Sequence, residues 1–424
     1  MADEIQTALR RHVVDAWFPR CFDTQYGGYL CDFDQAWRQA GPQQKLLEFQ
    51  ARQLLTAAEA CLLWPQDALL QDAVARGIAF LRGPMWDDVA GGWFHRTDRE
   101  GRPLAQRCKH VHGAAYAIQA CCAVYEATGD DAARTLALEG FAWMEAHARD
   151  AEHGGYWGLL SQANRPITEP AAWPQRTDPI GTPIGWKDVN VHSDLLEALG
   201  CLHRAQPTPA VTQSLEALAA LFCQRLLPAG PDLCFYYQAD WRPVAGIVSF
   251  GYEFQTVFRL LQLRAQLQAT SPAVIETLTR ALMDRALATA WDGPAHGCRA
   301  YAVPDDLPPW FSPLAAQATR RPWWVQTEML KAALAMSRLE PDAAIYRQSF
   351  EAQWRWIRDR LLDPVHGGCT TEPASDWPAW RALGRQRSQR AAALRKGSEW
   401  KDASHDGRAM VYAVRALRGD IHRS

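Results

Sequence analysis

The sequence has no long apolar run and no surplus of charge of one sign. No stretch approaches the roughly 18 consecutive apolar residues that a membrane-spanning helix requires. The 45 basic and 47 acidic residues are interleaved and give a formal net charge of -2. Such a chain presents no basic field to nucleic acid or to an anionic membrane. We therefore expect a small neutral partner, and neither nucleic acid nor a membrane.

Several other signals are missing. The amino-terminus, Met1 to Glu4, has neither the basic nor the apolar region of a secretory signal. The eleven cysteines include no CxxC pair and are scattered through apolar helical segments, which indicates reduced, buried thiols. There is no phosphate loop, dinucleotide fingerprint or Ser-His-Asp signature. We expect a cytoplasmic protein that uses no metal and no cofactor.

Tryptophan, by contrast, is abundant. The chain contains 19 tryptophans within an otherwise ordinary composition of 48% hydrophobic and 22% charged residues. Large flat rings build thick cores, and indole faces also pack against the C–H surfaces of sugars. The composition predicts a folded globular protein and favours a carbohydrate ligand.

Helical periodicity dominates the chain. Apolar residues recur with the 3.6-residue spacing of an amphipathic helix in six windows, whereas strand-like alternation is short and rare. The windows are residues 48–63, 113–127, 194–204, 254–266, 325–339 and 408–417. The pattern predicts an all-α protein.

A glycine turn recurs between these windows at intervals of roughly 63 to 80 residues. It is found at Tyr26-Gly27-Gly28-Tyr29, Gly91-Gly92-Trp93, His153-Gly154-Gly155-Tyr156, His296-Gly297-Cys298 and His366-Gly367-Gly368-Cys369. A further turn, without glycines, is expected near Leu233 to Tyr236. The interval fits two helices and a turn, so the chain reads as six helical-hairpin repeats.

Six helix pairs predict a closed (α/α)6 barrel with short β-hairpins between the helices, because a closed ring leaves no end repeat uncapped. We expect residues 1–424 to form this single domain, with an open solenoid as the alternative. Two proline-rich segments, residues 165–183 and 302–322, interrupt the repeat. Long loops of this kind are expected to form rims or lids over a site.

A polar cluster precedes each apolar window, and closure of the ring would gather all six clusters in one polar basin. One cluster contains His110 and His112. Their spacing turns the two side chains to one side only if the segment is extended, so a metal site there is a weaker alternative.

Five stretches of these clusters form a recognisable series. They are QARQ at residues 50–53, NxHxxLLEAL at 190–199, SFG at 249–251, WWxQxE at 323–328 and KGxxWKxxxHxGR at 396–408. In this order and spacing they resemble the N-acylglucosamine 2-epimerase superfamily, which includes cellobiose 2-epimerases and mannose isomerases. The resemblance covers nearly the whole chain. It implies an (α/α)6 barrel and an isomerase, either a sugar 2-epimerase or an aldose-ketose isomerase, acting on a hexose or its N-acyl or glycosyl derivative.

In this family a histidine removes the proton on C2 of an open-chain sugar and produces an enediol(ate). A neutral imidazole suits this step because its pKa lies near physiological pH. The resemblance makes His405 the catalytic histidine and places Arg52 near the sugar oxygens. It also implies that Trp324 and Glu328 contact the sugar.

The same clusters supply the other candidate residues. Tyr252, Glu253 and His192 join His405 as catalytic candidates. The remaining substrate-binding candidates are Lys109, Asn190, Asp194, Gln255, Trp400 and Arg408.

The chain departs from the family pattern at two positions. Gly251-Tyr252-Glu253-Phe254-Gln255 stands where the family reads G-H-D-[IV]-E, and Asp194 stands where a second histidine is common. A phenol is a poor base at neutral pH but a good hydrogen-bond donor. Asp194 with Glu197 also fits a capping box for the following helix.

Three interpretations of these departures stay open. His405 acts alone and returns the proton between C1 and C2, which isomerises an aldose to a ketose. Alternatively, His192, Asp194 or Glu253 has taken over a catalytic role. In the third interpretation the protein binds a sugar without turning it over.

A glycoside hydrolase on the same barrel is a further alternative, because fold does not determine function. It would need two carboxylates about 5 to 10 Å apart, for which Asp194, Glu253 and Glu328 are the candidates. For the assembly of the chain, a homodimer is left open.

Overall fold

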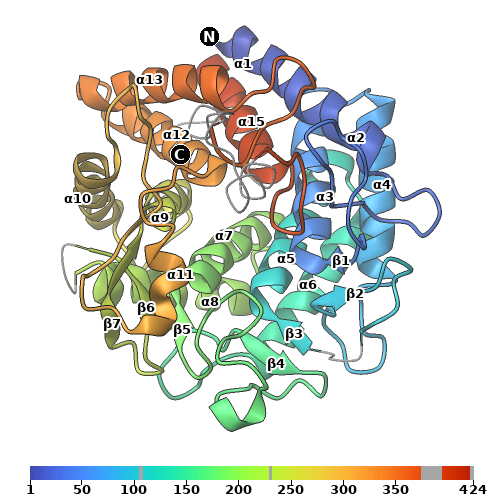
Figure 1. Ribbon diagram of the computed structural model, residues 1–424. Helices are drawn as coiled ribbons and strands as arrows, with labels where there is room; N and C mark the ends of the chain where they lie inside the picture. Colours follow the sequence, from blue (N-terminus) through green and yellow to red (C-terminus); the bar gives the residue numbers. More distant parts are fainter. Residues whose placement is uncertain (105–107, 229–231, 374–393, 421–424) are drawn as a thin grey trace.

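Six helices form a closed inner ring in the computed structural model, which describes residues 1–104, 108–228, 232–373 and 394–420 (Figure 1). The six are α3 (Leu47–Cys61), α5 (Val111–Thr128), α7 (Val189–Ala205), α9 (Phe250–Leu263), α12 (Trp323–Leu339) and α15 (Ser404–Arg418). Each packs against the next, and α15 packs against α3. The predicted (α/α)6 barrel is confirmed, and the open solenoid is excluded because the first and last inner helices touch.

Outer helices precede and follow the inner ones along the chain. They are α1 (Ala2–Leu9), α2 (Asp15–Cys21), α4 (Ala68–Arg82), α6 (Asp131–His147), α8 (Pro209–Ala220), α10 (Pro272–Ala290) and α13 (Ala344–Arg360). The outer layer also contains two π-helical turns, at Arg10–Val14 and Leu221–Leu226.

No helix in the described part of the chain is both long and apolar enough to pass through a bilayer. All eleven cysteines are free, and nine of them are buried.

The inner helices begin earlier than the apolar periodicity predicts. Their first turns carry polar side chains that face the ring, so the apolar stripe becomes visible only one turn later. His405 precedes the apolar window at residues 408–417 and would be expected in a loop before the helix; this expectation is wrong, because α15 begins at Ser404 and His405 is its second residue.

Short antiparallel strands connect the helices. β1 (Lys45–Leu46) pairs with β2 (Arg96–Thr97), and β3 (Cys108–His110) pairs with β4 (Leu159–Ser161). A four-stranded sheet has the order β5 (Lys187–Asp188), β6 (Cys234–Tyr237), β7 (Pro243–Ser249) and β8 (Tyr301–Ala302). The turn predicted near Leu233 to Tyr236 is wrong, because these residues lead into and form β6, whose backbone pairs with β7.

The two proline-rich segments contain short helical pieces. These are the 3-10 turns η2 (Pro170–Ala172) and η4 (Pro309–Phe311), and the helix α11 (Ser312–Ala315). Trp310 and Phe311 pack edge-on and tilted against Trp186, which immediately precedes β5. This contact holds the second segment against the end of the barrel at which α7 begins.

A buried lysine–aspartate pair ties down four of the glycine turns. The pairs are Asp23 with Lys45, Asp87 with Lys109, Asp150 with Lys187 and Asp363 with Lys396, at 2.5 to 2.9 Å. In each, the aspartate also accepts backbone N–H groups of the turn. A fully desolvated ammonium needs a carboxylate close by, so these lysines hold the repeats together.

The same turns are tied to the inner helices by one further hydrogen bond. The backbone N–H groups of Tyr29, Tyr156 and Cys298 donate to Gln50, His192 and Gln326, at 2.8, 3.0 and 2.8 Å. In the glycine-free repeat, the Leu233 N–H donates to Glu253 at 3.2 Å. Each accepting side chain is the fourth residue of its helix. The fourth position of these helices therefore has a structural task.

One glycine pair gives a matched test of this packing. Gly154 and Gly155 both have positive φ, of 75° and 72°. A Cβ on Gly154 would meet nothing within 4 Å, whereas one on Gly155 would lie 2.5 Å from Trp241 and 2.8 Å from His192. We expect Gly154→Ala to lower the free energy of unfolding by about 1 to 2 kcal/mol, the cost of a left-handed L-residue. Gly155→Ala should lower the free energy of unfolding by about 1 to 3 kcal/mol more than Gly154→Ala, because its Cβ overpacks the core. Equal losses in thermal and urea unfolding would contradict this account.

Candidate active site

The second and sixth residues of the inner helices lie on one face of each helix, because residues four apart are neighbours on a helix surface. These positions hold Glu48, Arg52, His112, Tyr116, Asn190, Asp194, Gln255, Trp324, Glu328 and His405. Several of these side chains meet across the ring, from helix to helix. Since all six amino-termini lie at this end, their helix dipoles favour negative charge there.

His405 is held by a carboxylate of the neighbouring helix. Its Nδ1 lies 2.8 Å from Oε1 of Glu328, and the other carboxylate oxygen lies 2.8 Å from Nζ of Lys331. Burial would raise the pKa of Glu328, but Lys331 and His405 lower it to about 2. The ionised carboxylate therefore accepts a hydrogen bond from Nδ1–H, and in the tautomer with its proton on Nδ1 the lone pair lies on Nε2.

Nε2 of His405 has no hydrogen-bond partner among the described residues. Two tryptophan rings flank the imidazole, with centroids 6.2 Å away for Trp323 and 6.0 Å away for Trp324. The side chain is 11% exposed. The arrangement is an imidazole oriented through Nδ1, with its other nitrogen near two indole rings.

Tyr252 contacts both Trp324 and Phe235 of β6. Its ring is 5.3 Å from the Trp324 ring and stacks on Phe235 at 5.2 Å. The Trp324 ring can lie this close because Gly251 has no side chain; a Cβ on Gly251 would be 2.0 Å from the ring. Burial, with the nearby charge of Asp194, raises the pKa of Tyr252 well above 10. The phenol remains protonated and can donate a hydrogen bond, but it is not a base at neutral pH.

Arg52 supplies a buried positive charge beside the imidazole-bearing helix. Its guanidinium lies over the ring of Tyr116 at 4.1 Å, and Nη1 is 3.6 Å from Asp402. Asp402 in turn accepts the Ser404 N–H in the first turn of α15, at 2.7 Å. Burial opposes the charge, but Tyr116 and Asp402 raise the pKa of Arg52, so it stays ionised. Its Nε atom is buried and has no hydrogen-bond partner among the residues that the structure describes. A spare donor of this kind suits a substrate oxyanion.

Asp194 belongs to a buried charge network rather than to a helix cap. It is the sixth residue of α7, and the cap is Asp188, which accepts the Val191 N–H at 2.6 Å. The capping-box interpretation of Asp194 is therefore wrong. One oxygen of Asp194 lies 3.1 Å from Nε2 of His112, and the other pairs with Arg259.

His112 sits between two carboxylates. Its Nδ1 is 3.1 Å from Glu48, opposite the contact with Asp194, and its side chain is 2% exposed. Burial lowers the pKa of His112, but Asp194 and Glu48 outweigh burial and raise it to about 9. Sequence reasoning placed His112 only in a general basin and missed Glu48 and Arg259. The four-residue spacing of Arg259 from Gln255 is the signal that could have found it.

The charge of His112 predicts a pH dependence of stability. Its folded-state pKa of about 9 lies above the ordinary 6.5, so the stabilisation is complete below pH 6.5 and is lost as pH rises through 9. We expect wild type to be more stable than His112→Gln at pH 6, with the gap narrowing by about 2 to 3 kcal/mol by pH 10. Unfolding of both proteins across this range checks the prediction. A constant gap would contradict it.

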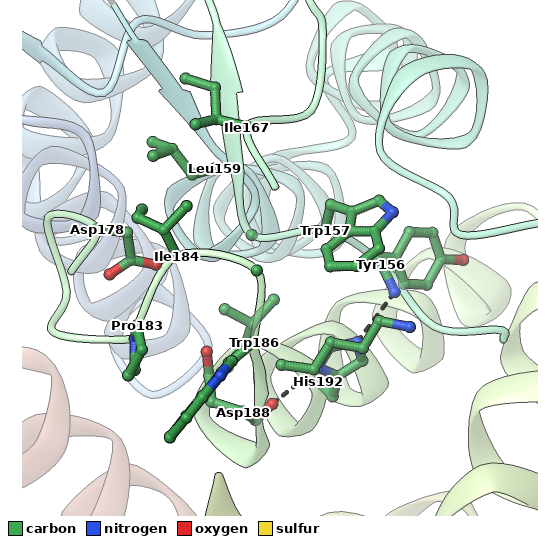
Figure 2. A pocket seen from close by; sticks show the side chains of 14 residues that line it. Tyr156, Trp157, Leu159, Ile167, Asp178, Pro183, Ile184, Trp186, Asp188 and His192 are labelled. Atoms are coloured by element: carbon green, nitrogen blue, oxygen red, sulfur yellow. Dashed lines mark hydrogen bonds between the residues drawn. The ribbon is translucent and has the colours of Figure 1, made fainter. Parts of the chain in front are cut away.

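His192 is committed to the backbone through both ring nitrogens (Figure 2). Nδ1 is 2.7 Å from the Asp188 carbonyl oxygen, and Nε2 accepts the Tyr156 N–H at 3.0 Å. Burial lowers the pKa of His192 to about 3. The hollow beside it measures about 10 Å³, room for no more than one water. Both ring nitrogens of His192 are therefore engaged by the backbone, and one of them holds the glycine turn.

Glu253 and Lys109 are also engaged away from His405. Glu253 accepts the Leu233 N–H and pairs with Arg285 of α10, so it faces the outer layer. Lys109 pairs with Asp87 and donates to the Gly91 carbonyl and to Asn164. The structure does not bring either residue together with the His405 cluster.

The remaining predicted residues lie at different depths. Gln255 accepts from Arg259 at 3.0 Å, so it borders the charge network. Asn190 is 8% exposed, with Oδ1 buried and unpartnered. Trp400 is half-buried in the loop before α15 and packs against the core. Arg408 pairs with Glu59 and Glu197, which lie deeper in the ring.

His110 and His112 do not share a ligand site. His110 pairs with Asp178 at 2.9 Å, whereas His112 pairs with Glu48 and Asp194. Among the described residues, no three or more histidine, cysteine, aspartate or glutamate side chains converge to hold a metal ion.

The candidate site is the polar end of a closed (α/α)6 barrel, where a carboxylate-bound imidazole lies near two indole rings. Residues 27–376 match the model of the N-acylglucosamine 2-epimerase (GlcNAc 2-epimerase) family. The chain belongs to this family, as the sequence resemblance predicted, and its relatives mark it as an isomerase.

Named relatives support this assignment. The cellobiose 2-epimerase of Ruminococcus albus is 23% identical over 377 residues, covering 87% of this chain and 89% of the relative. Cellobiose 2-epimerase from Spirochaeta thermophila superposes with a TM-score of 0.82 at 26% identity, over 99% of this chain and 97% of the other. A D-mannose isomerase shares the fold, with a TM-score of 0.78 at 20% identity over 98% and 97% of the two chains.

Proposed function

We propose that the protein is an aldose-ketose isomerase in which His405 is the single base. Its substrate is a hexose or a glycosylated hexose in the open-chain form. The observation that carries this proposal is the His405–Glu328 contact of 2.8 Å, which leaves Nε2 unpaired beside Trp323 and Trp324.

The proposed chemistry moves one proton between neighbouring carbons. Nε2 of His405 removes the proton on C2, and the C–H electron pair forms the C1–C2 double bond of an enediolate as the carbonyl oxygen on C1 takes up charge. Arg52 and the Tyr252 phenol are the donors proposed to stabilise the oxygens. The imidazolium then returns the proton to C1, and the hydroxyl proton on O2 moves to O1, leaving a ketose.

A two-base epimerisation lacks a second base in this proposal. Tyr252 keeps its proton, and both nitrogens of His192 are used by the backbone. Asp194 is shared between His112 and Arg259, which lower its pKa against the effect of burial. The single-base route needs none of these groups to change protonation.

A hydrolase is less well supported by the same contacts. It requires a carboxylic acid that remains protonated near neutral pH. The pKa values of Asp194 and Glu328 are both lowered. Burial raises the pKa of Glu253 to about 7, but its carboxyl group pairs with Arg285 on α10.

A cytoplasmic location completes the proposal and is supported by the eleven free cysteines.

Incubation in D2O tests the function. We expect one of mannose, glucose, fructose, N-acetylglucosamine or cellobiose to yield the ketose or aldose isomer with deuterium at C1 or C2. Formation of a C2 epimer without a ketose would show a two-base epimerase instead. If the folded protein leaves every sugar of the panel free of deuterium, a binding protein without turnover replaces the proposal.

A further inference from the structure

A second cavity lies at the opposite end of the ring, where the inner helices end. It has a volume of about 600 Å³ and is lined by late residues of α3, α5, α7, α9 and α15, together with Lys331 of α12. Its volume falls within the range of small-molecule sites, about 300 to 1,000 Å³. The inner helices run parallel, so this cavity is separated from His405 by the layer of charged side chains in the middle of the ring.

The cavity is lined by five basic and four acidic side chains. Arg408 spends two donors on Glu59 and Glu197. Arg204 donates to the Cys201 thiol at 3.2 Å. Within the described part of the chain, Arg204 and Arg415 make no ion pair, and neither do the carboxylates of Glu126 and Asp420 in the same wall. An incoming anion would find guanidinium donors at this mouth.

The walls add apolar surface and carboxylate acceptors. Phe258 and Tyr412 pack edge to face at 4.7 Å, and Tyr125 lines the same space. Gln119 is among the lining residues, but its side chain has no exposed surface, so a bound molecule does not reach its Oε1 atom. The carboxylates of Glu126 and Asp420 line the cavity and can accept a hydrogen bond from a donor on a bound molecule.

Lys331 connects this cavity with the base. Its side chain is 5% exposed, lines the cavity, and lies 2.8 Å from the Glu328 oxygen that does not touch His405. The other Glu328 oxygen holds Nδ1 of His405 at 2.8 Å. An anion that attracts the Lys331 ammonium would therefore alter the environment of the imidazole through a single carboxylate.

We propose that this cavity is a second ligand site, for a small organic anion with a flat apolar body and a hydrogen-bond donor, and that its occupant acts on His405 through Lys331 and Glu328. The effect on turnover rests on the proposed isomerase function, whereas binding does not. A hydroxylated aromatic carboxylate has the required chemistry.

Calorimetric titration with 4-hydroxybenzoate tests binding, and the neutral 4-hydroxybenzamide is the matched ligand. We expect the carboxylate to bind at least about tenfold more tightly than the amide. The double substitution Arg204→Gln with Arg415→Gln should weaken binding of the carboxylate by about 10- to 100-fold and leave binding of the amide unchanged. Ala123→Trp, which fills the wall, should abolish binding of both. No measurable binding of 4-hydroxybenzoate, or equal binding of the two ligands, overturns the proposal.

Selective labelling of the histidines tests the connection without turnover. Saturating 4-hydroxybenzoate should shift the side-chain NMR signal of His405, assigned through His405→Gln, and leave that of His192 in place. In an active enzyme the rate of deuterium exchange should change at least about twofold, and the Arg204→Gln with Arg415→Gln variant should lose this response. Binding with no movement of the His405 signal overturns the connection even if the protein turns over no sugar.

Discussion

His405→Gln is expected to lower kcat/KM for isomerisation by about 10²- to 10⁴-fold and to suppress deuterium exchange in parallel. Glutamine keeps a polar group near Glu328 but cannot take up a proton. The loss should therefore fall on kcat, with little change in sugar affinity. Steady-state rates and a direct binding measurement separate the two.

The appropriate control is another buried histidine. His192→Gln removes an imidazole that serves the glycine turn, so the folded fraction should retain most of its isomerase activity while its melting temperature falls. Near-wild-type turnover in His405→Gln, or loss of turnover in fully folded His192→Gln, would reverse the two assignments.

In the proposed mechanism Glu328 acts through His405, as a positioning residue. We expect Glu328→Gln to lower kcat by about 10- to 100-fold, as the loss of an orienting carboxylate commonly does. KM should stay close to the wild-type value, and circular dichroism should report an intact fold. A raised KM with unchanged kcat would mean that Glu328 binds sugar instead.

Asp194→Asn carries the largest expected cost in stability. Asp194 is 1% exposed and neutralises both His112 and Arg259, so the amide would leave two buried cations without their shared partner. Breaking a buried pair in this way costs about 3 to 5 kcal/mol. Urea unfolding followed by tryptophan fluorescence measures the loss.

Asp72→Asn is the matched control. Asp72 pairs with Arg76 four residues later on α4, and both side chains are more than one-third exposed. An exposed pair contributes about 0 to 1 kcal/mol, so this variant should unfold almost like wild type. A loss of similar size in the two variants would show that Asp194 is not part of an essential buried network.

Much of the architecture could be predicted because it is periodic. The 3.6-residue stripe marked all six inner helices, and the glycine pairs marked the turns between repeats. The starts of the helices were less predictable, since a polar first turn interrupts the stripe. The Leu233 to Tyr236 repeat was misread as a turn because its connection is a strand pair rather than a glycine turn.

The residues of the candidate site were likewise only partly predictable from the sequence. The family motifs pointed to His405, Glu328, Arg52 and Trp324, and the structure places these side chains around one end of the ring. His192 and Glu253 were plausible by chemistry alone. Both occupy the fourth position of an inner helix, whose side chain meets the preceding turn, and no property of an isolated histidine or glutamate reveals that partner.

The sequence by itself determined the helical repeat, the family and the residue types available for proton transfer. These depend on local periodicity and on short motifs, which are readable along the chain. Only the tertiary structure decided which histidine has a free nitrogen, that Lys109 ties a turn, and that Asp194 belongs to the network of His112 and Arg259. Protonation and function depend on neighbours brought together by ring closure, many of them more than 60 residues apart in the chain.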